Sequence, residues 1–458
     1  MINPKCKNLL LKKSSGHYTH FDYRRSPTKI YNYISNPPNI VTHGFYPLIH
    51  YQAISHKIKN GAKQPPKTRE IYYASHIDAW IYRYYSSLLN EKYNKSVKFL
   101  GLDDVAVAYR TNLGKNNIDF ANEAFSFLTK HENCYIIIGD FTNFFDNLDH
   151  KYLKKRLCQL LQVPLLPADW YSIFKNVTKY SYCDLIDLMS LKGYPDTKKA
   201  RMQFNKLQRI FTPQEFRSLK SKLLKYHNSS VGIPQGLPIS AVLANIYMLD
   251  ADKLISDTIK KSGGKYLRYS DDFIVCVPKG KIQLNDLINF IFNTIKSIPN
   301  LILSEAKTKV FEYANGEIFA RSPAPSDKMS NYHWSKSSLV FLGFDFDGRY
   351  IRLKDRTISR YYIKLYRKIK TIVKCKGITK NNHKITCKVL YDRYTQKGSI
   401  RQKLRHQNKS KSTRKINFDE GNFLDYIYRA KSRLGSKFIE KIALRHMGKI
   451  KRKLNDCL

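Results

Sequence analysis

The sequence predicts an α+β fold, and three observations support this prediction. Two strand-like runs, residues 265–268 and 273–277, flank a tight turn. A continuous apolar run, residues 134–139, is typical of a strand buried at the centre of a sheet. A helical period extends from Ile77 to about Tyr93. With 42% hydrophobic residues among 458, the chain can bury a sizeable core in two or three subdomains.

The turn between the first two strands, residues 269–272, contains two adjacent carboxylates. Asp271 and Asp272 repel each other and are desolvated by the flanking strands, so a bound divalent cation would explain the pair. An ordinary surface turn is the alternative. Asp140, which ends the buried run, favours the cation site because a carboxylate there points into a cleft. If the two strands are neighbours, the carboxylates converge on two Mg²⁺ ions roughly 3.5–4 Å apart, which Mn²⁺ could replace.

Five stretches of the chain resemble sequence motifs of reverse transcriptases. Residues 140–146 resemble motif A, and residues 269–272 resemble motif C, with Ser270 where alanine is commoner. The Gly- and Pro-rich loop 231–240 resembles motif B, although a generic turn leading into a helix is the alternative. Residues 301–309 and 339–346 resemble motifs D and E. The resemblance covers about residues 60–350 and implies a right-hand polymerase fold with fingers, a ferredoxin-like palm and a helical thumb.

From this resemblance we expect four regions along the chain. They are a basic N-terminal arm over residues 1–60, fingers over 61–130, a palm over 131–350 and a basic helical thumb over 351–458. Within the palm, residues 162–228 are a long, polar, partly helical insertion that resembles no motif. Further expectations are a turn at residues 36–39 and helices at about 147–161, 241–253 and 282–298.

The resemblance also implies catalytic and metal-binding roles. Asp140, Asp271 and Asp272 would be catalytic and, with Phe141, would hold the metal ions. Lys307, within the stretch that resembles motif D, would lie near the active site and could protonate the leaving pyrophosphate.

A second group of residues would contact the incoming nucleotide. A cation at Lys67 or Arg69, together with Arg110, would meet its triphosphate, although each could be an ordinary surface cation. Gln235 and Gly236 would allow close backbone approach to a nucleotide or template base. Five residues after Asp140 comes Phe145, where the family places an aromatic steric gate. A bulky ring there leaves no room for a 2′-hydroxyl and favours deoxynucleotides.

The charge of the chain points to a polyanionic partner. Its net charge is +45, and residues 351–458 contain 32 lysines and arginines against 7 acidic residues. A nucleic acid explains this excess better than a membrane or a merely soluble basic surface, because tyrosines lie among the cations. The residues expected to contact nucleic acid are Tyr269, Gly343, Lys364, Arg367, Lys368 and Lys370. Residues 351–458 would be the main clamp on RNA or a hybrid duplex.

Within the family, the sequence is most similar to bacterial defence-associated enzymes, the abortive-infection and "unknown group" class. The stretches 74–76, 108–110, 237–240 and 422–424 carry this similarity. A retron or group II intron-like enzyme is an alternative, as is template-independent or protein-primed DNA synthesis by the same site. The implied partners are an RNA template, in the form of a dedicated noncoding RNA, dNTPs and the DNA product. A homo-oligomer or a second defence protein is a further expectation.

Two other classes fit the sequence less well. A polymerase-fold chaperone without chemistry would not need three carboxylates, and a two-metal nuclease would leave the 232–240 loop and Phe145 unexplained. Eight scattered cysteines suggest a reducing compartment, and neither a signal-peptide pattern nor a membrane-spanning apolar run is evident. We therefore expect a cytoplasmic protein that does not contact a membrane.

Overall fold

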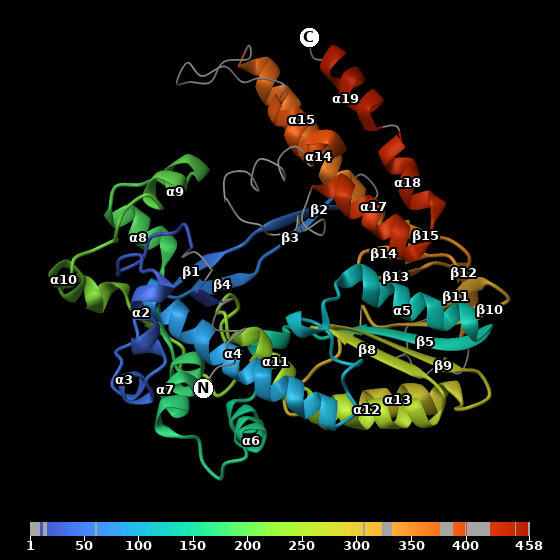
Figure 1. Ribbon diagram of the computed structural model, residues 1–458, viewed down its shortest axis with the longest axis horizontal. Coiled ribbons are helices and arrows are strands. Elements are labelled where there is room, and N and C mark those ends of the chain that lie inside the picture. The colour runs from blue at the N-terminus through green and yellow to red at the C-terminus, as the bar shows by residue number, and fades with distance from the viewer. Residues whose placement is uncertain are drawn as a thin grey trace.

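The computed structural model describes residues 10–11, 16–59, 62–305, 307–322, 332–375, 388–398, 400, 422–444 and 446–456. Helices and strands are mixed in it, as the sequence predicts, and helices cover both faces of a central sheet (Figure 1). The first nine residues of the expected N-terminal arm, and much of residues 376–421, lie outside the described residues.

The central sheet is antiparallel and has the strand order β12-β11-β10-β5-β9-β8. Its strands are β5 (Asn133–Asp140), β8 (Lys265–Tyr269), β9 (Asp272–Pro278), β10 (Lys309–Ala314), β11 (Glu317–Ser322) and β12 (His333–Ser337). Helix α5 (Asn117–Lys130) covers one face, and α12 (Leu249–Lys261) and α13 (Leu284–Lys296) cover the other (Figure 1).

Burial on both faces fixes the register of β5 against β9. Ile137 and Val275 belong to the apolar core on one side of the sheet, whereas Ile136 and Ile274 belong to the core on the other. A slip by one residue would exchange the two faces and disrupt the packing of both cores. Each fully buried side chain of this size contributes about 1.5–3 kcal/mol, so the register is strongly specified.

A second sheet has the order β4-β1-β6-β7, with β1 and β6 parallel. Its strands are β1 (Leu48–Gln52), β4 (Glu70–Tyr73), β6 (Ser181–Asp184) and β7 (Lys225–Tyr226), and a hairpin of β2 (Ser55–Lys59) and β3 (Ala62–Lys67) joins β1 to β4. The insertion 162–228 therefore supplies two strands of this sheet. It also contains helices α7 (Ala168–Thr178), α8 (Leu185–Leu191), α9 (Lys198–Phe204) and α10 (Pro213–Leu223).

Two of the elements predicted from the sequence differ in the structure, and both involve helices in the first 261 residues. The helices of this range not yet named include α2 (Pro27–Ile34), α3 (Pro37–Val41), α4 (His76–Phe99), α6 (His150–Leu161) and α11 (Ser240–Tyr247), with short 3-10 turns η1 (Thr111–Leu113) and η2 (Phe144–Asn147). Residues 36–39, predicted as a turn, begin α3, because proline is well tolerated in the first turn of a helix. The helix predicted at 241–253 is two helices that meet at Met248.

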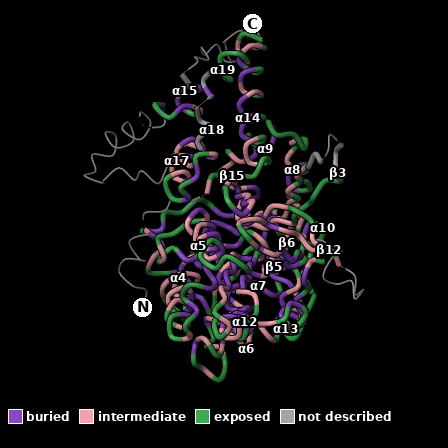
Figure 2. The backbone as a smooth tube through the Cα atoms, turned by 90° about the vertical axis from the view of Figure 1, so that its right-hand side faces the viewer, coloured by how far each residue is buried: buried purple, intermediate pink, exposed green. Residues whose placement is uncertain are grey.

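The C-terminal region begins with a three-stranded sheet of β13 (Leu339–Phe341), β14 (Phe344–Phe346) and β15 (Ile351–Leu353). The helices that follow within the described residues include α14 (Asp355–Lys374), α15 (Lys388–Tyr394), α17 (Phe423–Leu434), α18 (Lys437–Leu444) and α19 (His446–Asn455). Buried residues concentrate where β5, α7 and α12 lie, and α14 and α19 project away from that part (Figure 2). In the part of the chain that the structure describes, no helix is both long and apolar enough to cross a membrane.

Candidate active site

Three carboxylates lie where β5 and β9 meet. β5 ends at Asp140 and β9 begins at Asp272, and the two residues are partners in the antiparallel ladder. Directly opposed residues of neighbouring strands place their side chains on the same face of a sheet. The turn that joins β8 to β9 consists of Ser270 and Asp271, so Asp271 lies directly before Asp272 in the chain. The predicted hairpin, and the predicted neighbourhood of the two strands, are confirmed.

The turn holds an unusual backbone conformation. Ser270 has a φ of 62°, in the left-handed region that is costly for residues other than glycine. A positive φ at the first of two turn residues is the pattern of a type II′ hairpin, which matches the strand twist. Ser270 Oγ lies 3.1 Å from the hydroxyl of Tyr109, and the Arg268 guanidinium donates to the Ser270 carbonyl at 2.9 Å. These contacts preorganise the turn that carries Asp271.

Arg268 belongs to a buried polar network beneath the turn. Its guanidinium donates to the Asp252 carboxylate at 2.8 and 2.6 Å, and neither side chain is exposed. Tyr266 donates to the same carboxylate at 2.9 Å, and Arg268 donates to Asn245 at 3.2 Å. Burial lowers the pKa of Arg268, but the Asp252 charge outweighs this and raises it above its usual range. The cation beneath the turn is therefore permanent.

A cavity of about 550 Å³ opens at the turn. Its lining comes from the β3–β4 junction, the stretch after β5, the 231–240 loop and the β8–β9 turn. The residues predicted from the sequence that line it are Lys67, Arg69, Phe141, Phe145, Gln235, Asp271 and Lys307. A cavity of about 330 Å³ contains Asp140 and Asp272, and Lys307 lines this one too. The two cavities therefore adjoin at Lys307.

Lys307 is an ion-pair partner of Asp140. The ammonium contacts Asp140 Oδ2, whereas the buried Oδ1 has no hydrogen-bond partner among the described residues. Among those residues, no three His, Cys, Asp or Glu side chains gather closely enough to hold a metal ion. The donor chemistry nevertheless fits a hard divalent cation, because carboxylate and carbonyl oxygens are what Mg²⁺ prefers. A bound ion would take over the role of the Lys307 ammonium at Asp140.

Asp272 has an unusual proton affinity for a carboxyl group. Displacement of water by the surrounding protein, together with the charge of Asp271, raises the pKa of Asp272 to about 6, and Lys354 opposes this rise. Lys354 lines the smaller cavity beside Asp272. A carboxyl group with a raised pKa is stabilised in its ionised form by an added cation. The electrostatics of the turn therefore favour a positively charged ligand.

The prediction for Arg110 is wrong. Its side chain is fully buried and pairs with Asp103 at 2.5 Å. It also donates to Asn94 at 2.7 Å and to the Ala106 carbonyl at 3.2 Å. Because these partners occupy the guanidinium and it lines neither catalytic cavity, it cannot meet a triphosphate from this position. The residue holds the loop before Tyr109 in place.

The structure shows a reason for glycine at position 236, whereas its approach to a nucleotide or template base stays a prediction. Its φ of 116° does require glycine, and a Cβ atom there would collide with the Tyr72 carbonyl. The close approach is thus to β4 of the same chain, where the Tyr72 amide donates to the Gln235 carbonyl at 2.8 Å. Gly232 in the same 231–240 loop also lies too close to another segment for a side chain, since a Cβ there would lie 2.8 Å from the Asp146 carbonyl.

The residues expected to contact nucleic acid lie outside the 550 Å³ cavity. Tyr269 is half-buried and packs on Phe120 with ring centroids 6.3 Å apart. Gly343, with a φ of 92°, follows Leu342 in the two-residue turn between β13 and β14. On α14, Lys364, Arg367 and Lys370 are exposed and Lys368 is partly so. Their contacts with nucleic acid stay predictions.

Among the cavity residues to which sequence reasoning gave no role, three carry an ionisable side chain. Tyr109, 50% exposed with a φ of 64°, presents its ring beside Asp271. Glu70 and Asp146 face the same space, and burial and the Glu70 charge raise the pKa of Asp146. Their positions in the sequence could have indicated them, since Tyr109 is next to Arg110 and Asp146 is next to Phe145, two residues to which the sequence analysis gives roles.

The fold and the site define the class of the protein. A carboxylate at the end of a central strand, two more in the adjoining hairpin turn and a cation-lined cavity form the palm of a right-hand polymerase, a nucleotidyltransferase. Residues 82–346 match the family described as reverse transcriptase (RNA-dependent DNA polymerase). The match covers more than half of the chain, which therefore belongs to this family of RNA-directed DNA polymerases. Its members generally depend on divalent metal ions.

Solved structures with a similar arrangement are distant. The apo telomerase of Candida tropicalis is 13% identical, with a TM-score of 0.40 over 90% of this chain and 60% of its own. The Candida albicans telomerase in complex with a TWJ fragment of telomeric RNA is 14% identical, with a TM-score of 0.37 over 76% and 52%. The Sicinivirus 3Dpol RNA-dependent RNA polymerase is 12% identical, with a TM-score of 0.36 over 72% and 57%. The chain thus spans little more than half the length of these proteins, and no curated protein matches it.

Proposed function

We propose that the protein copies RNA into DNA from deoxynucleoside triphosphates, with Mg²⁺ or Mn²⁺ held by Asp140, Asp271, Asp272 and the Phe141 carbonyl. The observation that carries this proposal is that seven residues predicted to act together line one cavity of about 550 Å³. Bound ions would activate the primer hydroxyl and neutralise charge on the phosphates. The rest of the chemistry falls to side chains that the structure describes.

Cations at the entrance would bind and orient the triphosphate. Lys67 ends β3 and Arg69 lies just before β4, and both are exposed and line the cavity that Phe145 also lines. Two such charges offset the negative charge that develops on the leaving pyrophosphate. Lys307 is half-exposed and lines both cavities, so its ammonium would be available to donate a proton to that pyrophosphate.

Primer extension on an RNA template tests the activity directly. Asp271→Asn should lower the rate of deoxynucleotide incorporation by several orders of magnitude, because the charge that holds the ion is lost. Asp257→Asn on α12 is the matched control, since that carboxylate is exposed and, among the described residues, forms its ion pair with Lys253. Undiminished synthesis by the double variant Asp271→Asn, Asp272→Asn contradicts the proposal.

Phe145 should determine the choice of sugar. Its ring lines the cavity and packs beside Phe144, with centroids 5.6 Å apart. Phe145→Val should raise the efficiency of ribonucleotide incorporation relative to deoxynucleotide incorporation, because space opens for a 2′-hydroxyl. Phe144→Leu, which changes the buried neighbour, is the control and should leave that ratio unchanged. An unaltered ratio for Phe145→Val identifies the ring as a core residue.

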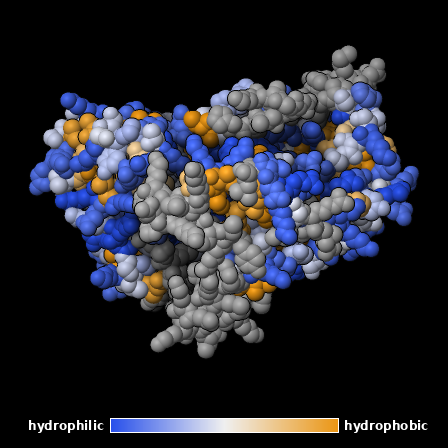
Figure 3. Space-filling view, turned by 90° about the horizontal axis from the view of Figure 1, so that it is seen from above, coloured by the Kyte–Doolittle hydropathy of each residue, from blue (hydrophilic) through white to orange (hydrophobic). Residues whose placement is uncertain are grey.

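We further propose that the enzyme works in bacterial antiviral defence with a dedicated noncoding RNA. The net charge of +45 supports a nucleic-acid partner, and most of the coloured side chains on the face shown in Figure 3 are hydrophilic. Sequencing the nucleic acid that copurifies with the protein identifies the template and product. Phage plating on bacteria expressing wild type or Asp271→Asn tests the defence role, and equal plating on both strains rejects it.

A further inference from the structure

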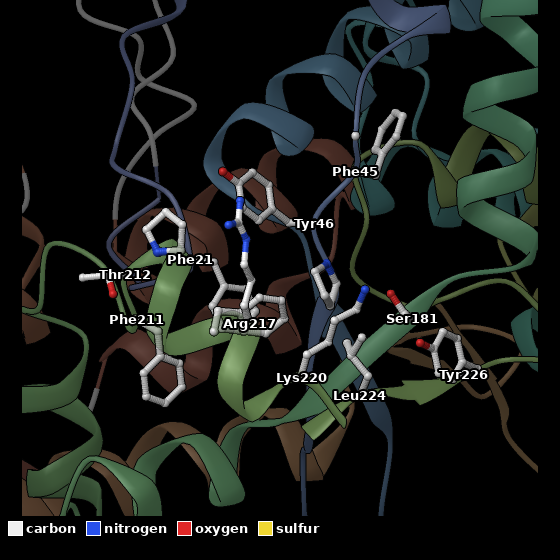
Figure 4. A pocket seen from close by; sticks show the side chains of 14 residues that line it. Phe21, Phe45, Tyr46, Ser181, Phe211, Thr212, Arg217, Lys220, Leu224 and Tyr226 are labelled. Atoms are coloured by element: carbon white, nitrogen blue, oxygen red, sulfur yellow. The ribbon is translucent and has the colours of Figure 1, made fainter. Parts of the chain in front are cut away.

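A cavity of about 450 Å³ lies apart from the catalytic cavities and shares no lining residue with them. Its walls come from residues 44–47 ahead of β1, from Phe21, from α10 and from the ends of β6 and β7 (Figure 4). Phe21 packs on Phe216 with ring centroids 4.6 Å apart and stacks on Phe211 at 6.5 Å. These rings give the cavity a packed aromatic floor.

Two tyrosines stand exposed at this cavity. Tyr46 is 39% exposed and Tyr226 is 61% exposed, although large aromatic rings usually bury most of their surface. Figure 4 shows Tyr46 near Phe21 at one end and Tyr226 near Ser181 at the other, with Arg217 and Lys220 between them. Accessible rings at both ends of a concave site offer flat surfaces for stacking.

The charge of the cavity is positive and uncompensated. Arg217 and Lys220 are exposed on α10, and within the described residues no carboxylate lies within ion-pair distance of either. None of the lining residues is acidic. Residues 192–226 contain ten lysines and arginines but only Asp196 and Glu215 as acids, and both acids are already paired with Arg201 and Lys192. An anionic ligand would meet no repulsion here.

We propose that this cavity binds an unpaired segment of RNA, held apart from the template strand in the catalytic cleft. Bases would stack on the Tyr46 and Tyr226 rings, and Arg217 and Lys220 would contact the phosphates. An acidic protein segment shares the negative charge, but two exposed aromatic rings flanking two cations suit the alternation of base and phosphate better. The inference rests on the proposed RNA partner, and the site itself needs neither nucleotide nor metal ion.

Binding can therefore be measured on the full chain in EDTA without nucleotides. The probe is a dodecamer of uridylate that carries one 4-thiouridine and a fluorescent label. After irradiation, mass spectrometry should find cross-links at Tyr46, Tyr226 or Phe216. Tyr226→Leu should weaken binding in fluorescence anisotropy by about tenfold, whereas Tyr226→Phe, which keeps the ring, should bind like wild type.

A matched pair of charge variants separates this cavity from general attraction to a basic surface. Arg217→Gln with Lys220→Gln should reduce the log–log salt slope by about 1.4, since each phosphate contact in a single strand contributes about 0.7. Lys206→Gln with Lys222→Gln removes the same charge from exposed positions that do not line the cavity, and should leave the slope unchanged. Both pairs should retain primer extension on a generic template, so a failure here is distinguishable from a failure of the polymerase assignment.

Three results overturn the proposal. The first is cross-linking confined to the catalytic cavities or to residues 351–458. The second is an equal change of salt slope in the two pairs of charge variants. The third is RNA binding that survives in the Arg217→Gln, Lys220→Gln variant while binding of a polyglutamate peptide is lost, which would assign the cavity to an acidic protein segment.

Discussion

Removing the charge of Asp252 should destabilise the palm far more than the small change in shape suggests. Asp252→Asn leaves the Arg268 guanidinium, which has no exposure, without its carboxylate partner. Two unit charges about 4 Å apart interact by roughly 4 kcal/mol at an effective dielectric constant near 20. Loss of one partner of a buried pair costs about 3–5 kcal/mol, because the remaining charge stays buried. The two figures agree.

Urea unfolding followed by circular dichroism measures this loss, and α12 supplies the control. Asp257→Asn breaks the exposed pair with Lys253 on the same helix, where the side chains are 40% and 45% exposed. Such a pair contributes about 0–1 kcal/mol, so the control should unfold at nearly the wild-type urea concentration. Equal shifts of the unfolding midpoint in the two variants would refute the reasoning.

Three more predictions follow from the site and the C-terminal helices. Gly236→Ala should destabilise the protein by about 1–3 kcal/mol in the same assay because its methyl group meets the Tyr72 carbonyl, whereas Gly101→Ala, at a φ of 69° and in open space, should cost less. Metal-free Asp272→Asn should melt above wild type at pH 7, and the gap should close as the pH falls from about 6 to below 4. The variant is the more stable protein because a pKa of about 6 means that ionised Asp272 destabilises the folded state at neutral pH. Equal melting temperatures of the two proteins at pH 7 in differential scanning calorimetry would contradict this prediction. Replacing Lys364, Arg367, Lys368 and Lys370 with Gln should reduce the salt slope of hybrid-duplex binding by roughly 3 in a filter-binding titration, while Lys151→Gln with Lys155→Gln on α6 should not. An unchanged slope in the quadruple variant would move the clamp away from α14.

The palm could be predicted because its signals are local in sequence. The apolar run of each strand in the β5–β9 pair predicts that strand, and the sequence shows a carboxylate at a strand end without knowledge of the partner strand. The prediction that Asp140 and Asp271 converge, with Asp272 nearby, needed only the assumption that the two strands are neighbours, and the structure pairs Asp140 directly with Asp272. Side-chain alternation then placed both carboxylates on one face.

Arg110 and Gly236 show where this kind of reasoning stops. A sequence shows that residue 110 is a cation, but only the folded chain shows that Asp103 and Asn94 enclose it. The need for glycine at 236 was correctly inferred, yet the group that comes close is the Tyr72 carbonyl. In both cases the partner lies on another segment, and no pattern around the residue specifies it.

The insertion 162–228 could not be assigned for the same reason. β6 pairs with β1 so that Tyr182 stands opposite Leu48, far away in sequence. The strand is only four residues long, too short for a period to emerge, and its one buried residue, Cys183, belongs to a core with Ile49 and Phe204. Non-local pairing of short strands leaves little trace in the sequence of either strand.

The polar network beneath the turn joins two stretches that the sequence presents as separate motifs. Arg268 donates its backbone amide to the Val105 carbonyl at 2.8 Å, and its own carbonyl accepts from the Val107 amide at 3.0 Å. Asn245 donates to the Ala108 carbonyl at 3.0 Å, so the loop is fixed by backbone and side-chain bonds together. Tyr109 follows directly and reaches the Ser270 hydroxyl. Because Arg268 anchors both the loop and the turn, the ring that faces the cavity and the carboxylates beside it are positioned as one unit.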